Sequence, residues 1–133
     1  MLLDHWTTPE LGTMPAAEAR ILSALRLWVV MNKLGRPPMQ MVTERLGSAR
    51  AAAHLHLLIE EIGAAWPEPF CVSPPCCRRL SHDEATLGAM VAIAGGGDRR
   101  AFDRLLEELL PPDVRERLFL SSAMLARNVG APD

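Results

Sequence analysis

Apolar residues recur along this chain at the spacing of α-helices. In one segment they follow the i, i+4, i+7, i+11 pattern of a single buried stripe: Ala51, Leu55, Leu58 and Ile62. Comparable segments, separated by Gly and Pro, predict helices over about residues 14–34, 38–46, 48–65, 81–94, 98–110 and 113–129. Because the connections between them are short, we expect an all-α fold, a compact bundle of about six helices.

Local signals mark the boundaries of these helices. Ser81 and Glu84 have the spacing of a capping box, in which each side chain accepts the backbone N–H of the other residue. Single residues mark four other starts: Thr13, Ser48, Asp98 and Asp113. Glycines mark four ends: Gly35, Gly47, Gly95 and Gly130.

Two of the predicted helices differ in how their apolar residues are distributed. In the first, nearly the whole circumference is apolar: Ile21, Leu22, Leu25, Leu27, Trp28, Val29, Val30, Met31 and Leu34. A helix of this kind lies at the centre of a fold or at an interface. The helix over residues 98–110 has one apolar face: Phe102, Leu105, Leu106, Leu109 and Leu110. Its polar face carries the i, i+4 pair Arg99 with Asp103, as is typical of a surface helix.

Length and composition predict a single domain. A chain of 133 residues, 49% of them hydrophobic, can bury one core, so residues 1–133 are expected to fold as one unit. We divide it into an N-terminal arm (1–13), a first helical half (14–66), a cysteine-bearing loop (67–80) and a second helical half (81–130).

Charge and cysteine content indicate a cytoplasmic protein that does not bind membranes. The net charge of -2 gives no overall attraction to nucleic acid or to an anionic membrane. The start MLLDHWTT lacks the basic region of a signal peptide, and the longest uncharged stretch, residues 85–97, is too short to span a bilayer. An odd number of cysteines, three, fits a reducing compartment.

Residues 70–84, FCVSPPCCRRLSHDE, hold all three cysteines and separate the two helical halves. The surrounding prolines each lack a backbone N–H: Pro67, Pro69, Pro74 and Pro75. A long helix or a central strand is therefore excluded here. At most, residues 70–73 and 78–80 could form a short edge ribbon.

Three interpretations of this loop stay open. It contains four possible zinc ligands, although their C-x4-C-C-x4-H spacing is not a usual zinc pattern: Cys71, Cys76, Cys77 and His82. Alternatively, Arg78, Arg79 and the adjacent helix start could favour a reactive thiolate at Cys77. The interpretation that we prefer has the cysteines packing as small apolar residues, without any cofactor.

The residues favour a non-catalytic interaction or regulatory module over an enzyme. A nucleophile built from Cys77, His82 and Asp83 is conceivable, but residues five and six apart along a loop and a helix start rarely converge. The apolar first helix and the apolar N-terminal arm exceed what a small bundle easily covers, which predicts self-association or a protein partner. The candidate interaction residues are Trp6, Trp28, Arg78 and Arg79.

The alternative is a winged-helix DNA-binding regulator. Residues 38–63 are typical of a helix, a Gly turn and a second helix, and a Pro-rich hairpin ending in Arg-Arg would form the wing. The candidate contacts to nucleic acid are Arg45, Arg50 and His54, but two glutamates at the end of the second helix would repel DNA.

The loop sequence SPPCCRRLSHDEATL resembles an uncharacterised family of small helical proteins from alphaproteobacteria. That family has a cysteine cluster, a basic or Pro residue, and a Thr/Ser helix cap before Asp-Glu-Ala. The corresponding residues here are Cys76, Cys77, Arg79, Ser81, Asp83, Glu84 and Ala85. This chain has two adjacent cysteines where the family has three. The resemblance covers about a quarter of the chain and implies a helical fold, without a known activity.

Overall fold

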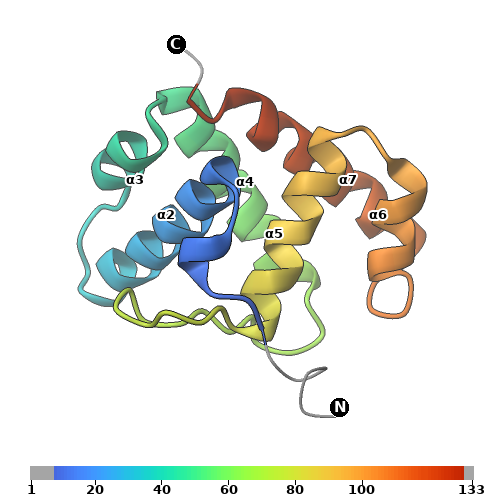
Figure 1. The fold of residues 1–133 in the computed structure, drawn as a ribbon, viewed down its shortest axis with the longest axis horizontal. Helices are drawn as coiled ribbons and strands as arrows, with labels where there is room; N and C mark the ends of the chain where they lie inside the picture. Colours follow the sequence, from blue (N-terminus) through green and yellow to red (C-terminus); the bar gives the residue numbers. More distant parts are fainter. Residues whose placement is uncertain (1–7, 131–133) are drawn as a thin grey trace.

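The computed structural model describes residues 8–130. These residues form one short 3-10 helix, η1 (Leu11–Thr13), and six α-helices: α2 (Ala16–Lys33), α3 (Met39–Leu46), α4 (Ala49–Ala65), α5 (His82–Gly95), α6 (Arg99–Leu106) and α7 (Pro112–Asn128). Within this range the only β pairing is an isolated antiparallel bridge between Glu10 and Arg79. The predicted all-α bundle is therefore confirmed (Figure 1).

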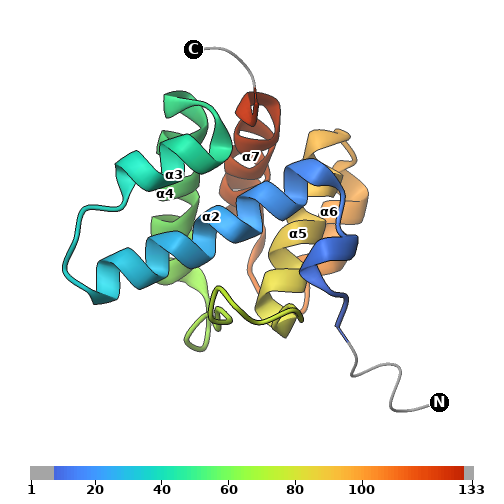
Figure 2. The same ribbon diagram turned by 60° about the vertical axis from the view of Figure 1, so that its left-hand side comes forward.

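Helix α7 packs against both α4 and α5. Figure 2 shows α2 crossing in front of these three helices. At the sides, α3 packs against α2 and α4, and α6 packs against α5 and α7. The buried core draws on every α-helix, with large side chains such as Leu22, Leu46, Leu55, Met90, Phe102 and Leu125. No helix in the described part of the chain is long and apolar enough to cross a membrane.

Most of the predicted helix starts are confirmed. The Ser81 hydroxyl accepts the N–H of Glu84 at 3.0 Å, and the Glu84 carboxylate accepts the N–H of Ser81 at 2.7 Å, which completes the capping box. Ser48 and Asp98 each accept the backbone N–H three residues on, at 3.1 and 3.0 Å. The left-handed φ of +77° at Gly47 ends α3, as predicted.

The predictions that Thr13 and Asp113 cap helices are wrong. Thr13 closes η1, where its hydroxyl donates to the carbonyl of Glu10, and α2 begins only after Pro15. Asp113 lies in the first turn of α7, which already starts at Pro112. Pro15 is instead the N-cap residue of α2, and Pro112 is the first helical residue of α7, where its missing N–H costs nothing and its φ already suits a helix.

Two predicted apolar surfaces are smaller than expected. In α2 the buried residues lie at Ile21, Leu22 and 24–26, whereas residues 27–31 are half-buried and Leu34 is 63% exposed. The second surface is the apolar face of the helix predicted over residues 98–110. There α6 ends at Leu106, and the following residues form a tight turn. That turn returns Leu110 to the core and leaves Leu105 and Leu109 exposed.

Candidate functional site

A buried ion pair joins α2 to α5. The Arg26 and Glu84 side chains are 1% and 0% exposed. Arg26 Nε lies 2.8 Å from Glu84 Oε2, and Arg26 Nη2 lies 3.0 Å from Oε1. This bidentate geometry matches the planar guanidinium to the carboxylate, and its charge-assisted hydrogen bonds are among the strongest in proteins.

The same guanidinium also holds the cysteine-bearing loop. Arg26 Nη1 donates to the carbonyl of Cys77 at 2.6 Å, and Nη2 donates to that of Arg79 at 3.0 Å. Arg26 was missed in the sequence analysis, although one signal was present. It is a lone charge inside an apolar helix segment, and a buried charge requires a partner.

Each member of the pair stabilises the charge of the other. The hydrogen bond with Glu84 raises the pKa of Arg26 above its usual value, against the effect of burial. Burial alone would raise the pKa of Glu84, but hydrogen bonds from Arg26 and from the Ser81 N–H more than offset it. The pKa of Glu84 is therefore lowered, and both groups stay ionised at neutral pH.

The start of α5 anchors the loop a second time, at Cys71. The Cys71 N–H donates to Asp83 Oδ2 at 2.7 Å, and the Ser81 hydroxyl donates to the Cys71 carbonyl at 2.6 Å. Phe70 and Val72 are half-buried while Cys71 is exposed, as in an extended segment whose side chains alternate. The sequence allowed at most a short ribbon between residues 70–73 and 78–80. It is absent, and Arg79 pairs with Glu10 instead.

The cysteine thiols are not packed into the core as a group. Cys71 and Cys76 are exposed and Cys77 is half-buried, so our preferred interpretation is wrong for the first two. Within residues 8–130 no three His, Cys, Asp or Glu side chains form a group that could hold a metal ion. The structure therefore does not assemble the four candidate zinc ligands, which include the exposed His82.

The other predicted site residues are dispersed. Arg78 and Arg79 are exposed, and Arg79 Nη1 donates to the carbonyl of Thr8 at 2.8 Å. Trp28 is half-buried on α2, and Trp6 lies outside the described residues.

The residues of the DNA-binding alternative share α3 and α4 but form no reading surface with a wing. Arg45 donates to the Ser23 hydroxyl, Arg50 is exposed and His54 is half-buried. Residues 67–80 contain no hairpin, so the wing expected in that stretch is absent.

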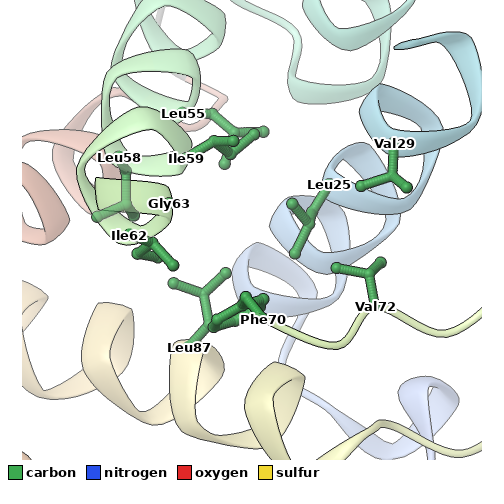
Figure 3. Close-up of a pocket in the computed structure, with 10 residues that line it drawn as sticks. All are labelled: Leu25, Val29, Leu55, Leu58, Ile59, Ile62, Gly63, Phe70, Val72 and Leu87. Atoms are coloured by element: carbon green, nitrogen blue, oxygen red, sulfur yellow. The ribbon is translucent and has the colours of Figure 1, made fainter. Parts of the chain in front are cut away.

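An open apolar pocket of about 240 Å³ lies between α2 and α4. We call it the α2–α4 pocket. Ten residues line it: Leu25, Val29, Leu55, Leu58, Ile59, Ile62, Gly63, Phe70, Val72 and Leu87. None of these residues carries a polar side chain. In Figure 3 the side chains of both helices, of α5 and of the loop point toward the same space.

Two aromatic rings meet across the same pair of helices. Trp28 directly precedes Val29, His56 directly follows Leu55, and the two ring centroids are 6.0 Å apart. Trp28 Nε1 and His56 Nδ1 are both buried and have no hydrogen-bond partner among the described residues. An unpaired buried polar group costs about 1–3 kcal/mol, so each needs a physical explanation.

A second hollow, of about 390 Å³, lies on the outer side of the loop. Its lining includes Cys71, Glu68 and Asp83. Both Asp83 oxygens already accept hydrogen bonds, one from the Cys71 N–H and one from Trp66 Nε1 at 3.3 Å. Asp83 is therefore occupied in holding the loop to α5, and this hollow offers a thiol without a paired base.

The α2–α4 pocket was not predictable from the pattern of apolar residues. Two weak signals existed: Gly63 inside a helical pattern, and the apolar Phe70 and Val72 flanking Cys71 in the loop. Neither signal indicates which pair of helices would be separated by an unfilled space.

No family model, no curated protein and no solved structure matches this chain. The fold therefore defines only the class of protein, an all-α bundle with an open apolar pocket. The family resemblance of the cysteine loop stays a prediction.

We expect strong coupling between Arg26 and Glu84. Arg26→Met and Glu84→Gln should each lower the free energy of unfolding by about 3–5 kcal/mol, because each leaves a buried charge unpaired. The double variant should lose clearly less unfolding free energy than the sum of the losses in the two single variants. Urea unfolding of the four proteins measures this coupling. The control is the exposed pair Arg117 and Asp113, 3.8 Å apart, which should show no comparable coupling. Additive losses of unfolding free energy for the buried pair would contradict the prediction.

Stability should fall in acid because of Glu84. Its pKa is lowered on folding from the usual 4.5, so its contribution is complete above about pH 4.5 and is lost as the pH falls through the lower folded pKa. Glu84→Gln keeps a side chain that can complete the capping box but removes this titration. Urea unfolding at pH 7 and pH 3.5 should therefore show a smaller acid loss for Glu84→Gln than for the wild type. The exposed variant Glu108→Gln should behave as the wild type, and equal acid losses in all three would contradict the assignment.

Proposed function

We propose that this chain is a non-catalytic binding and interaction module that works through the α2–α4 pocket. The observation that carries the proposal is an open space of about 240 Å³ with no polar side chain in its lining. An apolar cavity of roughly 150 Å³ already binds a benzene-sized molecule. Apolar pockets with few polar groups are the usual form of small-ligand sites.

The way the pocket is built supports this role. Residues of α2, α4 and α5 form most of its lining. Phe70 and Val72 of the cysteine-bearing loop complete it, and Arg26 and Asp83 hold that loop by hydrogen bonds. A ligand would therefore meet a site that is already formed, which lowers the entropy cost of binding. A lining without an acid, a base or a nucleophile favours binding over catalysis.

The test uses N-phenyl-1-naphthylamine, a neutral dye whose fluorescence rises in apolar sites. Gly63 borders the pocket, and a Cβ added there would meet nothing within 4 Å. Gly63→Leu should therefore weaken dye binding at least tenfold by filling the pocket. It should not lower the unfolding free energy, because Gly is about 0.8–1.0 kcal/mol less favourable than Ala in a helix interior and Leu ranks just below Ala.

The control is Ala92→Leu, which adds the same side chain at an exposed position of α5 and should bind the dye as the wild type does. Absence of dye binding to the wild type, or equal binding by Gly63→Leu, would overturn the proposal.

For the protein partner we propose a second copy of the chain, meeting the first through a surface that we call the α4–α7 face. It consists of Leu57 on α4 and Leu120 and Met124 on α7, with Leu57 and Leu120 48% and 57% exposed. The two helices pack against each other. Glu60 lies within one helical turn of Leu57 on α4, and Arg127 lies within one helical turn of Met124 on α7. A two-fold axis would therefore bring acidic edges against basic ones.

Sedimentation equilibrium tests this contact. The wild type should show a mass that rises with concentration toward that of a dimer, and Leu120→Glu should stay monomeric because it buries a charge in the interface. Leu34→Glu, at an exposed leucine at the end of α2, is the matched control and should still associate. A wild-type monomer at high concentration would rule out the α4–α7 contact and leave the pocket proposal untouched.

The cytoplasm is the compartment that we propose for this module, because exposed free thiols such as Cys71 and Cys76 persist only where the environment is reducing. For DNA binding, no contact, charge cluster or groove in the described residues provides specific support.

A further inference from the structure

We propose that the ligand of the α2–α4 pocket carries a neutral, rigid group of two fused hydrocarbon rings, which fills the pocket and makes no hydrogen bond there. This inference rests on the proposed function, because it names the chemical class of ligand for the same pocket. It depends on three properties of the space: its volume, the lack of polar side chains in its walls, and the fixed position of those walls.

The volume of the pocket sets the size of this group. An apolar cavity of roughly 150 Å³ holds a single benzene ring. The α2–α4 pocket measures about 240 Å³, so one ring would leave much of its apolar surface uncovered. Two fused rings, as in naphthalene, occupy about half as much space again as benzene and therefore match the larger volume. Because the pocket is open, a larger molecule can place its remaining atoms outside.

The walls select a group without polar atoms. None of the ten lining residues has a side chain that forms hydrogen bonds or carries a charge. The lining residues on α2, α4 and α5 lie beyond the first turn, so their N–H groups are bonded within each helix. In the loop, both backbone groups of Cys71 are bonded to the start of α5. A polar atom that entered would lose hydrogen bonds to water without replacement.

The shape and fixed position of the walls favour rings over a flexible chain. Figure 3 shows the lining side chains of α4 on one side, those of α2 opposite, and Phe70 with Leu87 across one end, which leaves a broad space. Two of these walls are helices, and the hydrogen bonds of Cys71 hold the loop wall against α5. A flexible chain must give up bond rotations to lie in such a space, whereas fused rings have none to lose.

The experiment measures, by displacement of N-phenyl-1-naphthylamine, the affinity of the wild type for naphthalene, benzene, quinoline and n-butylbenzene. Naphthalene should bind at least about tenfold more tightly than benzene, because it covers more apolar surface. Quinoline has the shape of naphthalene but one ring nitrogen that would stay unpaired, so it should bind at least about tenfold more weakly than naphthalene. n-Butylbenzene has as many carbon atoms as naphthalene but a flexible chain, and it should bind no more tightly.

A small change at Gly63 tests the fit. Gly63→Ala adds one methyl group to the lining, at a position where nothing lies within 4 Å. It should weaken naphthalene at least about fivefold more than benzene, because two rings already fill the space and one ring leaves room. Alanine also favours the helix over glycine, so the variant should fold. Ala92→Leu, the exposed control on α5, should bind both molecules as the wild type does.

The outcomes separate this inference from the proposed function. Suppose that the dye binds the wild type and is lost in Gly63→Leu. If naphthalene then binds no more tightly than benzene, if quinoline equals naphthalene, if n-butylbenzene binds more tightly, or if Gly63→Ala does not discriminate against naphthalene, the pocket stands and the two-ring group is wrong. If the dye does not bind the wild type, both proposals fail. Tight binding of naphthalene that Gly63→Ala selectively weakens supports both.

Discussion

The ion pair between Arg26 and Glu84 is the constraint on which the rest of the structure depends. Removing two charges from water costs several kcal/mol for each ion, and only good geometry with every hydrogen bond satisfied can offset that cost. Here the guanidinium makes four such bonds, two to Glu84 and two to loop carbonyls, while Glu84 also caps its own helix. Because these bonds are directional, they fix one relative position of α2, α5 and the loop.

That fixed position determines the shape of the α2–α4 pocket. The loop residues Phe70 and Val72 form one wall. The backbone of Cys71, which lies between them, is bonded to the start of α5, and Arg26 holds the loop further along, at Cys77 and Arg79. The pocket is open to solvent, and apolar surface in contact with water costs free energy that a bound apolar molecule would recover. This is the physical basis of the function that we propose.

The cysteine-bearing loop has a different role from the one that its residue types indicate. Its thiols suggested metal binding, reactivity or burial, yet the contacts that matter come from its backbone. The carbonyls of Cys77 and Arg79 accept from Arg26, and both the N–H and the carbonyl of Cys71 are held by α5. Prolines prevent this stretch from forming a helix, so its backbone N–H and C=O groups need partners elsewhere in the protein. The main chain is therefore bonded to Arg26 and α5, while the cysteine side chains can remain exposed.

The sequence by itself determined the local structure of this protein. Capping at Ser48, Ser81 and Asp98, the stop at Gly47 and the buried stripe of α4 were all predictable, because each depends on residues within a few positions of one another. Only the tertiary structure decided that Arg26 would meet a carboxylate 58 residues away, that the cysteines would not gather, and that α2 and α4 would leave an apolar space between them. These features depend on the packing of distant helices, and apolar periodicity states which face of a helix is buried without stating what will lie against it.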